Sequence, residues 1–530
     1  MNSSTLQVYN TISRKKEEFK PIEAGKVRMY VCGPTTYNFI HLGNARPIVV
    51  FDTVRRYLQY LGYDVTYIQN FTDVDDKIIK RAREENDQPL ELAARYIREY
   101  FADADKLNVT RADVHPKVSE HMAEIIDFVA KLIAKGYAYE IDGDVYFSVR
   151  KFTDYGKLSG RSIDDLLSGA RVEVDQRKKD PLDFALWKKA KAGEPAWKSP
   201  WGEGRPGWHI ECSAMSCKYL GKEIDIHGGG YDLVFPHHEN EIAQTEALFD
   251  SPLARYWLHN GFITVNQEKM SKSLGNFFLL REILEKFDPM VIRFYLLATH
   301  YRSPLDFDDE KLEVAQKGLE RLKNSYFQLD NVLKNSKEHN TGQRLQEALV
   351  KIKENFINAM NDDFNTALAI AALFDLAREV NTYLKEPVPD QKTLEKARGL
   401  FEELLGVIGV AFPAKDIENS ELTEDLMTFM INLRQKSRKE KNFAFADRIR
   451  DELKQRGLVL EDSPQGTIWK INGADQGLAD KILQFVIEIR QDARKNKDFA
   501  TADYIRDELK KSGVIFEDTL QGTNWKMLKE

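Results

Sequence analysis

The sequence has little cysteine and no long apolar run. Three cysteines in 530 residues are too few for disulfides to stabilise the chain, so in a reducing compartment the thiols would stay available for metal binding or chemistry. No stretch of 18 apolar residues occurs, and residues 1–20 are mostly polar. The sequence therefore predicts neither a membrane-spanning helix nor a secretory signal, and we expect a cytoplasmic protein.

A strong basic excess is also missing. The formal net charge is −7, so the chain as a whole lacks the positive charge typical of nucleic-acid-binding proteins, and any RNA contact must come from local patches. With 42% apolar and 30% charged residues, a chain of 530 residues is long enough for several domains with full cores.

Two short motifs predict a nucleotide site. His41-Leu-Gly-Asn44 directly precedes a helical pattern, and Lys269-Met-Ser-Lys-Ser273 follows much later in the chain. Free N–H groups and the dipole at the amino end of the helix favour a phosphate group. Lys269 and Lys272 can then place two ammonium charges around pyrophosphate as charge develops on it. The five-residue motif alone would also fit a lysine-rich surface loop, but the pair in this order predicts an ATP site that forms an adenylate.

Residues 1–110 have the pattern of a mononucleotide-binding unit. A buried strand is predicted over residues 26–31, then a helix that ends at Gly62, then a second strand over residues 63–68. Polar residues, including Thr72, follow the second strand, at the end where open α/β sheets bind ligands. Another strand is predicted at residues 224–230. Helix and turn signals alternate from about 116 to 200, which predicts an insertion into the sheet.

A second group of residues indicates a metal site. Cys32 ends the first predicted strand, and Cys212 is the second cysteine. His237 and Glu241 are four residues apart and face the same way on a predicted helix whose first turn contains Pro236. Two thiolates, an imidazole and a carboxylate suit zinc. The spacing matches no compact zinc finger, and isolated cysteines often only pack, so a structural role stays open.

Two neighbouring residues are alternative ligands. His238 and Glu239 have suitable side chains, although the helical pattern places them on another face. Cys217 lies one helical turn beyond Cys212 and is expected to pack. The residues alone therefore leave the ligand set open.

Six segments resemble a known family. They are residues 30–46, 70–80, 204–215, 225–230, 235–241 and 268–276. In this order they resemble cysteinyl-tRNA synthetase, a class I aminoacyl-tRNA synthetase, over residues 26–310. The family signature His-Ile-Gly-His is His-Leu-Gly-Asn here, and Asn44 keeps a hydrogen-bond donor but cannot carry a charge.

The resemblance implies an α/β fold with five regions. A Rossmann-like class I synthetase catalytic core would contain an inserted subdomain and be followed by a helical-bundle domain and a small duplicated α/β module. The expected ranges are 1–115 for the first half of the catalytic domain, 116–203 for the inserted connective subdomain, 204–310 for the second half with the KMSKS loop, 311–420 for the helical stem and tRNA-binding bundle, and 421–530 for the duplicated anticodon-recognition module.

The resemblance also implies the chemistry, which is ATP-dependent ligation of L-cysteine to its tRNA through a cysteinyl-adenylate. The catalytic residues would be His41, Asn44, Lys269 and Lys272. Gly43 and Ser271 would join them in binding ATP, which brings Mg²⁺. The expected partners are ATP, L-cysteine and cysteine tRNA, without a membrane, and the protein is expected to be a monomer.

The zinc set gains a specific role from the resemblance. One zinc ion per chain would be held by Cys32, Cys212, His237 and Glu241. The thiolate of the substrate would bind this zinc, which separates cysteine from serine more strongly than an apolar pocket can. Thr72 and Trp208 would line the amino-acid pocket, and the alternative for Trp208 is an ordinary core aromatic.

The C-terminal part combines a predicted bundle with a repeat. Residues 359–378 are predicted to form one helix of the bundle. The pattern of residues 434–469 recurs at 490–525, and each copy predicts a helix, a turn at Gly457 or Gly513, a short strand and Gly-Thr-x-Trp. Residues 434–456 carry nine Lys/Arg against four Asp/Glu, a positive face suited to phosphates and unpaired bases, although such helices are usually only solvated. The family usually has one copy, so the role of the second stays open.

Other functions stay open beside this one. A ligase that joins cysteine to an amino sugar in mycothiol synthesis shares the core and zinc set but lacks the anticodon module, so residues 420–530 argue against it. A non-catalytic RNA-binding protein would show decay at His41, Lys269, Lys272 or a zinc ligand, and none has decayed. The resemblance also leaves open a persulfide-forming side reaction with pyridoxal phosphate on lysines of residues 77–80 or 269–272.

Overall fold

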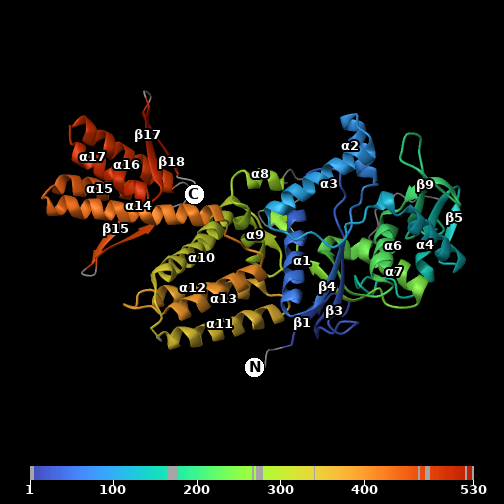
Figure 1. Cartoon of the computed structure of the whole chain (residues 1–530). Coiled ribbons are helices and arrows are strands. Elements are labelled where there is room, and N and C mark those ends of the chain that lie inside the picture. The colour runs from blue at the N-terminus through green and yellow to red at the C-terminus, as the bar shows by residue number, and fades with distance from the viewer. Residues whose placement is uncertain are drawn as a thin grey trace. The chain divides into compact units, whose positions relative to one another are not determined.

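The computed structural model describes residues 5–163, 177–265, 268–269, 278–339, 341–412, 414–463, 466–471, 478–519 and 522–527. The chain divides into two compact units, the first made of residues 1–319 and 338–411 and the second of residues 320–337 and 412–530 (Figure 1). Among the described residues, no helix combines the length and the apolar character needed to cross a membrane.

The first unit is built on a parallel four-stranded sheet. Its strands are β3 (Lys26–Val31), β4 (Asp64–Gln69), β10 (Ile224–Gly230) and β11 (Ala254–Asn260), in the order β11-β10-β3-β4. Both β3 and β4 end in three consecutive buried residues, as is typical of parallel sheets. Helix α1 (Leu42–Tyr60) connects them and ends before Gly62, whose φ of +91° glycine adopts easily. The predicted Rossmann-like core is confirmed, with β4 beginning one residue later than expected.

The region predicted to be an insertion forms a second, antiparallel sheet. After α2 (Asp76–Glu85), α3 (Pro89–Lys106), η1 (Val118–Glu120) and α4 (Met122–Ala134) come β5 (Ala138–Ile141), β6 (Asp144–Phe147), η2 (Val149–Lys151), β7 (Phe184–Lys189), β8 (Trp197–Ser199) and β9 (Gly202–Pro206). The strand order is β5-β6-β7-β9-β8. Phe147 and Trp187 share one buried core with Tyr30 and Ile68 of the parallel sheet, so the two sheets are packed together.

The remaining elements of the first unit surround these sheets. They are β1 (Gln7–Asn10), β2 (Lys15–Glu18), α6 (Trp208–Leu220), η3 (Tyr231–Leu233), η4 (Val234–His238), α7 (Glu239–Phe249), β12 (Ile263–Val265), β13 (Glu268–Lys269), α8 (Leu280–Leu284), α9 (Pro289–Leu297), β14 (Leu305–Asp306), α11 (Gln343–Asn361), α12 (Thr366–Tyr383) and α13 (Gln391–Val407). Helix α10 (Asp309–Asn335) contributes residues to both units. Helices α11, α12 and α13 pack on one another as a bundle.

The helix predicted over residues 359–378 is wrong at its start. Helix α11 continues into this range, and α12 begins only at Thr366. Between them, Asp363 has a φ of +62°, which no helix accommodates. Its buried carboxylate accepts hydrogen bonds from Tyr9 N at 2.8 Å and Tyr301 OH at 2.9 Å. These tertiary contacts hold the turn, and the local pattern does not contain them.

The second unit contains both copies of the repeat. The first copy consists of α14 (Ala414–Lys439), α15 (Phe443–Gln455), β15 (Leu458–Ser463) and β16 (Gly466–Ile471). The second copy consists of α16 (Leu478–Lys495), α17 (Phe499–Lys511), β17 (Val514–Thr519) and β18 (Gly522–Met527). Gly457 and Gly513 precede the hairpins with φ of +86° and +78°, so the predicted order of elements is confirmed. Within this unit, Figure 1 shows the two hairpins projecting to opposite sides of the helices.

A buried ion pair ties α1 to distant parts of the first unit. Asp52 on α1 and Arg293 on α9 are 1% and 0% exposed, and their side chains lie 2.5 Å apart. The Arg293 guanidinium also donates to Leu107 O at 3.0 Å and to Ile408 O at 2.8 Å. It occupies the space beside Gly409, where a Cβ atom would lie 2.2 Å from it. Arg293 therefore holds α1, the end of α3 and the end of α13 together.

Replacing Asp52 by Asn should leave the Arg293 charge buried without a carboxylate. We expect the free energy of unfolding of the first unit to fall by about 3–5 kcal/mol. The matched control is Asp375→Asn, which removes an exposed pair with Arg378. This control should change the free energy of unfolding by less than about 1 kcal/mol. Urea unfolding followed by circular dichroism measures both, and equal losses would contradict the role of the buried pair.

Candidate functional site

One cavity lies at the carboxyl ends of all four parallel strands. Its lining residues at these strand ends are Gly33, Gln69, Gly230 and Asn260. The cavity has a volume of about 360 Å³ and also borders Cys32 and the start of α1. Oδ1 of Asn260 is buried and has no hydrogen-bond partner among the described residues, so a ligand could satisfy it. The size and position are those of a small-molecule site in an open α/β sheet.

The start of α1 is held by reciprocal hydrogen bonds between His41 and Asn44. Asn44 N–H donates to His41 Nδ1 at 3.2 Å, and His41 N–H donates to Asn44 Oδ1 at 3.2 Å. Because Nδ1 accepts a hydrogen bond, a neutral His41 ring carries its proton on Nε2. The prediction that both residues lie at the amino end of a helix is confirmed, and each keeps a side-chain N–H donor.

Fewer backbone N–H groups are available at this helix end than the sequence indicates. Leu42 N donates to Phe278 O at 3.2 Å, and Asn44 N donates to His41. Of the first three N–H groups of α1, that of Gly43 alone has no partner within the described parts of the chain. Phosphate binding here would depend on the side chains of His41 and Asn44 more than on the helix end itself.

The second motif is connected to the first through the backbone. Lys269 lies in β13, which pairs antiparallel with β12. Ser271 and Lys272 lie outside the described residues, so their roles stay predictions. Seven residues after the end of the motif, Leu280 N donates to Ile40 O at 3.0 Å. The segment that follows the second motif therefore contacts the start of α1.

Arg46 connects α1 to the segment that leads into the second motif, and sequence reasoning missed it. Its buried guanidinium donates to the carbonyls of Gly261, Phe262, His300 and Ser303, at 2.9, 2.9, 3.3 and 2.6 Å. The first two carbonyls directly precede β12, so a side chain of α1 holds the strand that leads into the second motif. Burial lowers the pKa of Arg46 to about 10, which leaves it charged at neutral pH. In the sequence, the indication of this role was the position of Arg46 two residues after Asn44.

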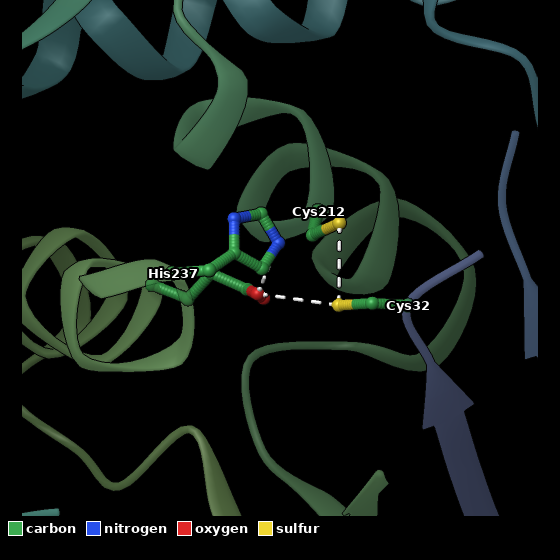
Figure 2. Close-up of side chains that lie close together, drawn as sticks. Cys32, Cys212 and His237 are labelled. Carbon is green, nitrogen blue, oxygen red and sulfur yellow. Dashed lines mark hydrogen bonds and ion pairs between the residues drawn. The ribbon is translucent and has the colours of Figure 1, made fainter. Parts of the chain in front are cut away.

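Four side chains converge beside the end of β3. Figure 2 labels three of them, Cys32, Cys212 and His237. Cys32 Sγ lies 3.5 Å from Cys212 Sγ and 3.4 Å from Glu241 Oε1. His237 Nε2 lies 3.1 Å from the same carboxylate oxygen. One ligand atom of each residue lies within 4.8 Å of all the others. The structure brings together all four residues that the sequence predicts as metal ligands.

The spacing of these atoms suits a tetrahedral metal ion. With bonds of about 2.0–2.3 Å to zinc, the edges of the tetrahedron are about 3.3–3.8 Å long. The contacts between the donor atoms, at 3.1, 3.4 and 3.5 Å, are close to that range. Two thiols, an imidazole and a carboxylate are donors that zinc accepts. The residues therefore fit zinc in both geometry and chemistry.

The backbone that places His237 and Glu241 differs from the predicted helix. Pro236 is not in the first turn of α7, because α7 begins at Glu239 and the separate turn η4 precedes it. Phe235 within η4 has an extended conformation, with φ −141° and ψ 132°. This residue reorients the chain, so the directions of the side chains that follow cannot be taken from an ideal helix.

His238 points into the cluster, contrary to the prediction. Its Nε2 lies 3.3 Å from Cys32 Sγ. A second possible ligand set therefore consists of Cys32, His227, His238 and Glu241. This set shares two residues with the first but contains one thiol instead of two. Because thiolates are the softer ligands that zinc prefers, the first set is favoured. Glu239 faces away as predicted and accepts hydrogen bonds from Gly156 N and Ser159 N.

Aromatic and imidazole rings surround the cluster. Trp208 stacks on His237 with ring centroids 4.2 Å apart, and His209 Nδ1 lies 3.0 Å from His237 Nδ1. His227 Nε2 lies 2.8 Å from Glu241 Oε2. Such partners fix the orientation and basicity of metal ligands. Sequence analysis predicted Trp208 but missed His209 and His227, which lie beside the motifs without a recognisable spacing.

The charges of the cluster shift the pKa values of its members. Although burial acts against it, the Glu241 carboxylate raises the pKa of His237 to about 10. The imidazoles of His227 and His237 lower the pKa of Glu241 to about 2 despite its burial. Burial and the neighbouring Cys212 raise the pKa of the Cys32 thiol. A divalent cation would displace the imidazole and thiol protons, so metal binding should strengthen as pH rises.

The two predicted substrate contacts differ in position. Thr72 is 1% exposed, and its hydroxyl donates to Glu211 Oε2 at 2.9 Å. It is not among the described residues that line the cavity, so its contact with a substrate stays a prediction. Trp208 lines the cavity and is 39% exposed, which does not suit an ordinary core aromatic.

Known protein families match both parts of the first unit. Residues 18–317 match the catalytic domain of class I (C) tRNA synthetases. Residues 355–412 match the DALR domain, and they include α12 and α13. The first match alone spans more than half of the 530 residues.

Two bacterial relatives are similar over most of the chain. A cysteine–tRNA ligase of Desulforamulus reducens is 60% identical over 530 residues and covers 98% of this chain and 99% of its own length. One of Heliobacterium modesticaldum is 61% identical over 478 residues and covers 88% of this chain and 99% of its own. The share of this chain that the second relative leaves uncovered is similar in length to one copy of the repeat.

Solved structures share the fold at low identity. Methionyl-tRNA synthetase of Mycobacterium tuberculosis bound by methionyl-adenylate has a TM-score of 0.56 and 14% identity, over 75% of this chain and 94% of that one. LeuRS of Agrobacterium radiobacter K84, in a ternary complex with tRNA, has a TM-score of 0.54 and 13% identity, over 74% and 85%. At these identities the likeness shows the fold alone.

Replacing Cys212 by Ser should remove most of the bound zinc. The unchanged protein should contain about one zinc ion per chain, because four donors in this geometry form one site. The matched control is Cys217→Ser on the same helix, which lies outside the cluster and should keep the metal. Elemental analysis by mass spectrometry measures both. Zinc retained in Cys212→Ser but lost in His238→Ala would mean that the second ligand set holds the metal.

Proposed function

Because the chain belongs to the cysteine–tRNA ligase family of class I aminoacyl-tRNA synthetases, we propose that it joins L-cysteine to the 3′ end of cysteine tRNA through a cysteinyl-adenylate. The enzyme class, an aminoacyl-tRNA ligase, follows from the family. The observation that carries the proposal is that Cys32 of the metal-capable cluster and the start of α1 border one cavity of about 360 Å³. A thiol and a nucleotide could therefore bind within reach of each other.

The first step forms the adenylate. The carboxylate oxygen of cysteine attacks the α-phosphorus of ATP, and pyrophosphate leaves with the electrons of the broken bond. His41 Nε2–H and Asn44 Nδ2–H would donate to phosphate oxygens on which charge builds up. Lys269 and Lys272 would neutralise the departing pyrophosphate, with Gly43 and Ser271 completing the ATP contacts. Mg²⁺ would accompany ATP and offset its charge.

The second step transfers the amino acid. A ribose hydroxyl of the terminal adenosine attacks the acyl carbon, the hydroxyl proton is lost, and AMP leaves. This reaction needs no nucleophile from the protein, so the chain contributes positioning and charge. The bundle and the second unit would bind the tRNA. The expected cytoplasmic location and monomeric state belong to the same proposal.

The metal cluster would select the amino acid. Its ligands would be Cys32, Cys212, His237 and Glu241. When bound, zinc could accept a soft thiolate as a further ligand, which the protonated alcohol of serine does not match. Trp208 stacks on His237 at 4.2 Å and would limit the directions from which a side chain can approach. An apolar pocket alone would separate the two amino acids by only about 100-fold.

Neither alternative function accounts for the whole chain as well. Joining cysteine to an amino sugar gives no role to the duplicated second unit, whereas a tRNA ligase needs an RNA-binding part. A non-catalytic RNA-binding protein has no need for the reciprocal bonds between His41 and Asn44 or for the assembled metal cluster.

Cysteine-dependent exchange of pyrophosphate with ATP tests the proposed function. Exchange should occur without tRNA, and serine should support less than about 1% of the cysteine rate, because the metal discriminates beyond the ~100-fold of an apolar pocket. The control is the charging of a cysteine tRNA transcript, which should require both ATP and cysteine. Equal exchange with serine, or transfer of cysteine to an amino sugar but not to tRNA, would refute the proposal.

Arg46 should act as a positioning residue for ATP. In Arg46→Lys one ammonium cannot reach four carbonyls from two segments, so β12 and the following motif should shift and slow adenylate formation by roughly 100-fold. Zinc content and the KM for cysteine should stay unchanged, because the cluster lies on other elements. Pre-steady-state adenylate formation separates these effects. A parallel loss of zinc and of cysteine affinity would show general damage instead.

A further inference from the structure

The two copies of the repeat contact each other through their helices. Arg448 of α15 pairs with Asp492 of α16 at 2.8 Å. Arg456, which follows α15, pairs with Glu488 of α16 at 3.3 Å. Arg456 comes after Arg448 in the first copy, but its partner Glu488 comes before Asp492 in the second. Helices α15 and α16 therefore run in opposite directions. The start of α15 therefore lies near the end of α16.

The reverse contact occupies the equivalent positions. When the two copies are aligned, Arg448 corresponds to Tyr504 and Lys436 to Asp492, and Lys436 Nζ lies 4.1 Å from the centroid of the Tyr504 ring. Helix α14 thus meets α17 as α16 meets α15, so the copies are related by an approximate two-fold rotation. The pKa of Asp498, which caps α17, is lowered by hydrogen bonds from Thr501 and also by the charge of Lys436. The start of α17 therefore lies near the end of α14.

The loops that lead into α15 and α17 consequently lie at the same end of the second unit. The first residue after each loop is an exposed phenylalanine, with Phe443 57% and Phe499 60% exposed. Lys441 and Lys497 have φ of +61° and +63°, so both loops turn in the same way. Neither phenyl ring belongs to the buried core of this unit. Packing does not explain why both copies expose the ring at the same position.

The arginines along the helices are paired with carboxylates, whereas the lysines at these loops are not. Arg434 makes two hydrogen bonds to Asp462, at 2.8 and 2.7 Å, and the contact between the copies uses Arg448 and Arg456. Three arginines of the positive face predicted for residues 434–456 are therefore paired with carboxylates. In the described part of the chain, four exposed lysines beside or in these loops have no ion-pair partner. Lys439 and Lys495 end α14 and α16, and Lys441 and Lys497 lie in the loops. Each loop also contains one carboxylate, Glu440 or Asp498.

We propose that the two loops form one composite surface that binds unpaired nucleotides of the tRNA, with a phenyl ring from each copy stacking on a base and the loop lysines contacting phosphates. This rests on the proposed function, which supplies an RNA with unpaired bases as the partner. An accessible aromatic ring beside lysines offers both things that a single-stranded segment needs, a stacking face and positive charge. The second copy then enlarges the RNA contact.

Binding of the full-length protein to a cysteine tRNA transcript tests this surface. Phe499→Ala should raise Kd roughly 10-fold through the loss of one stacked base. Lys495→Glu with Lys497→Glu should raise Kd and reduce the slope of log affinity against log salt by about 1–2. The same changes at Phe443 and at Lys439 with Lys441 should have equal effects. The matched controls Lys454→Glu and Lys510→Glu, exposed at the far ends of α15 and α17, should change Kd little.

Two outcomes would overturn the composite surface. If the second-copy variants bind tRNA as tightly as the unchanged protein while the first-copy variants do not, the second loop has no part in RNA binding. If no loop variant weakens tRNA binding but all lose self-association in sedimentation, the surface binds a second copy of the chain. Cysteine-dependent pyrophosphate exchange without tRNA should be unchanged in every variant. If the unchanged protein also lacked this exchange, the proposed function itself would be wrong. That result differs from a failure of the RNA-binding surface alone.

Discussion

Parallel pairing of β3 with β4 and β10 is the constraint on which the candidate site depends. It brings the carboxyl ends of these strands to one edge, where Cys32 N–H still donates to Gly228 O at 3.2 Å. The next residue, Gly33, passes so close to the chain after β4 that a Cβ atom would lie 1.6 Å from Asn70 O. Only glycine fits this crossing, so the thiol of Cys32 is held at the edge where α6 and η4 supply Cys212 and His237.

Helix α1 carries the connections between this edge and the rest of the first unit. Its first turn contains the reciprocal hydrogen bonds of His41 and Asn44, and the next turn contains Arg46, which holds the strand before the second motif. Farther along, Asp52 pairs with the buried Arg293. Because one rigid helix carries all these contacts, a disturbance at Asp52 could displace the ATP-binding end, and small displacements of reacting groups are costly to catalysis.

The duplicated unit shows how two copies with one fold can become complementary. At equivalent places, Arg448 faces Asp492 and Tyr504 faces Lys436. Two first copies joined in this way would place Arg448 against Lys436, and like charges at that distance repel. The divergence of the two copies therefore favours their pairing with each other, while the loops before α15 and α17 keep the same exposed ring.

The sequence by itself determined the family, the parallel core and the repeat, and its resemblance to the family indicated the four residues of the first ligand set. Each of these is recorded in a local pattern or a motif, such as the alternation of strand and helix around His41-Leu-Gly-Asn44. Tertiary structure alone decided the start of α12, the direction of His238 and the role of Arg46. Asp363 is held by Tyr9, which is 354 residues away in the sequence, and Arg46 binds carbonyls that are likewise far from it. Likewise, the arginines that look like an RNA-binding face are neutralised by carboxylates of their own hairpin and of the other copy, because charges that are distant in sequence become neighbours only on folding.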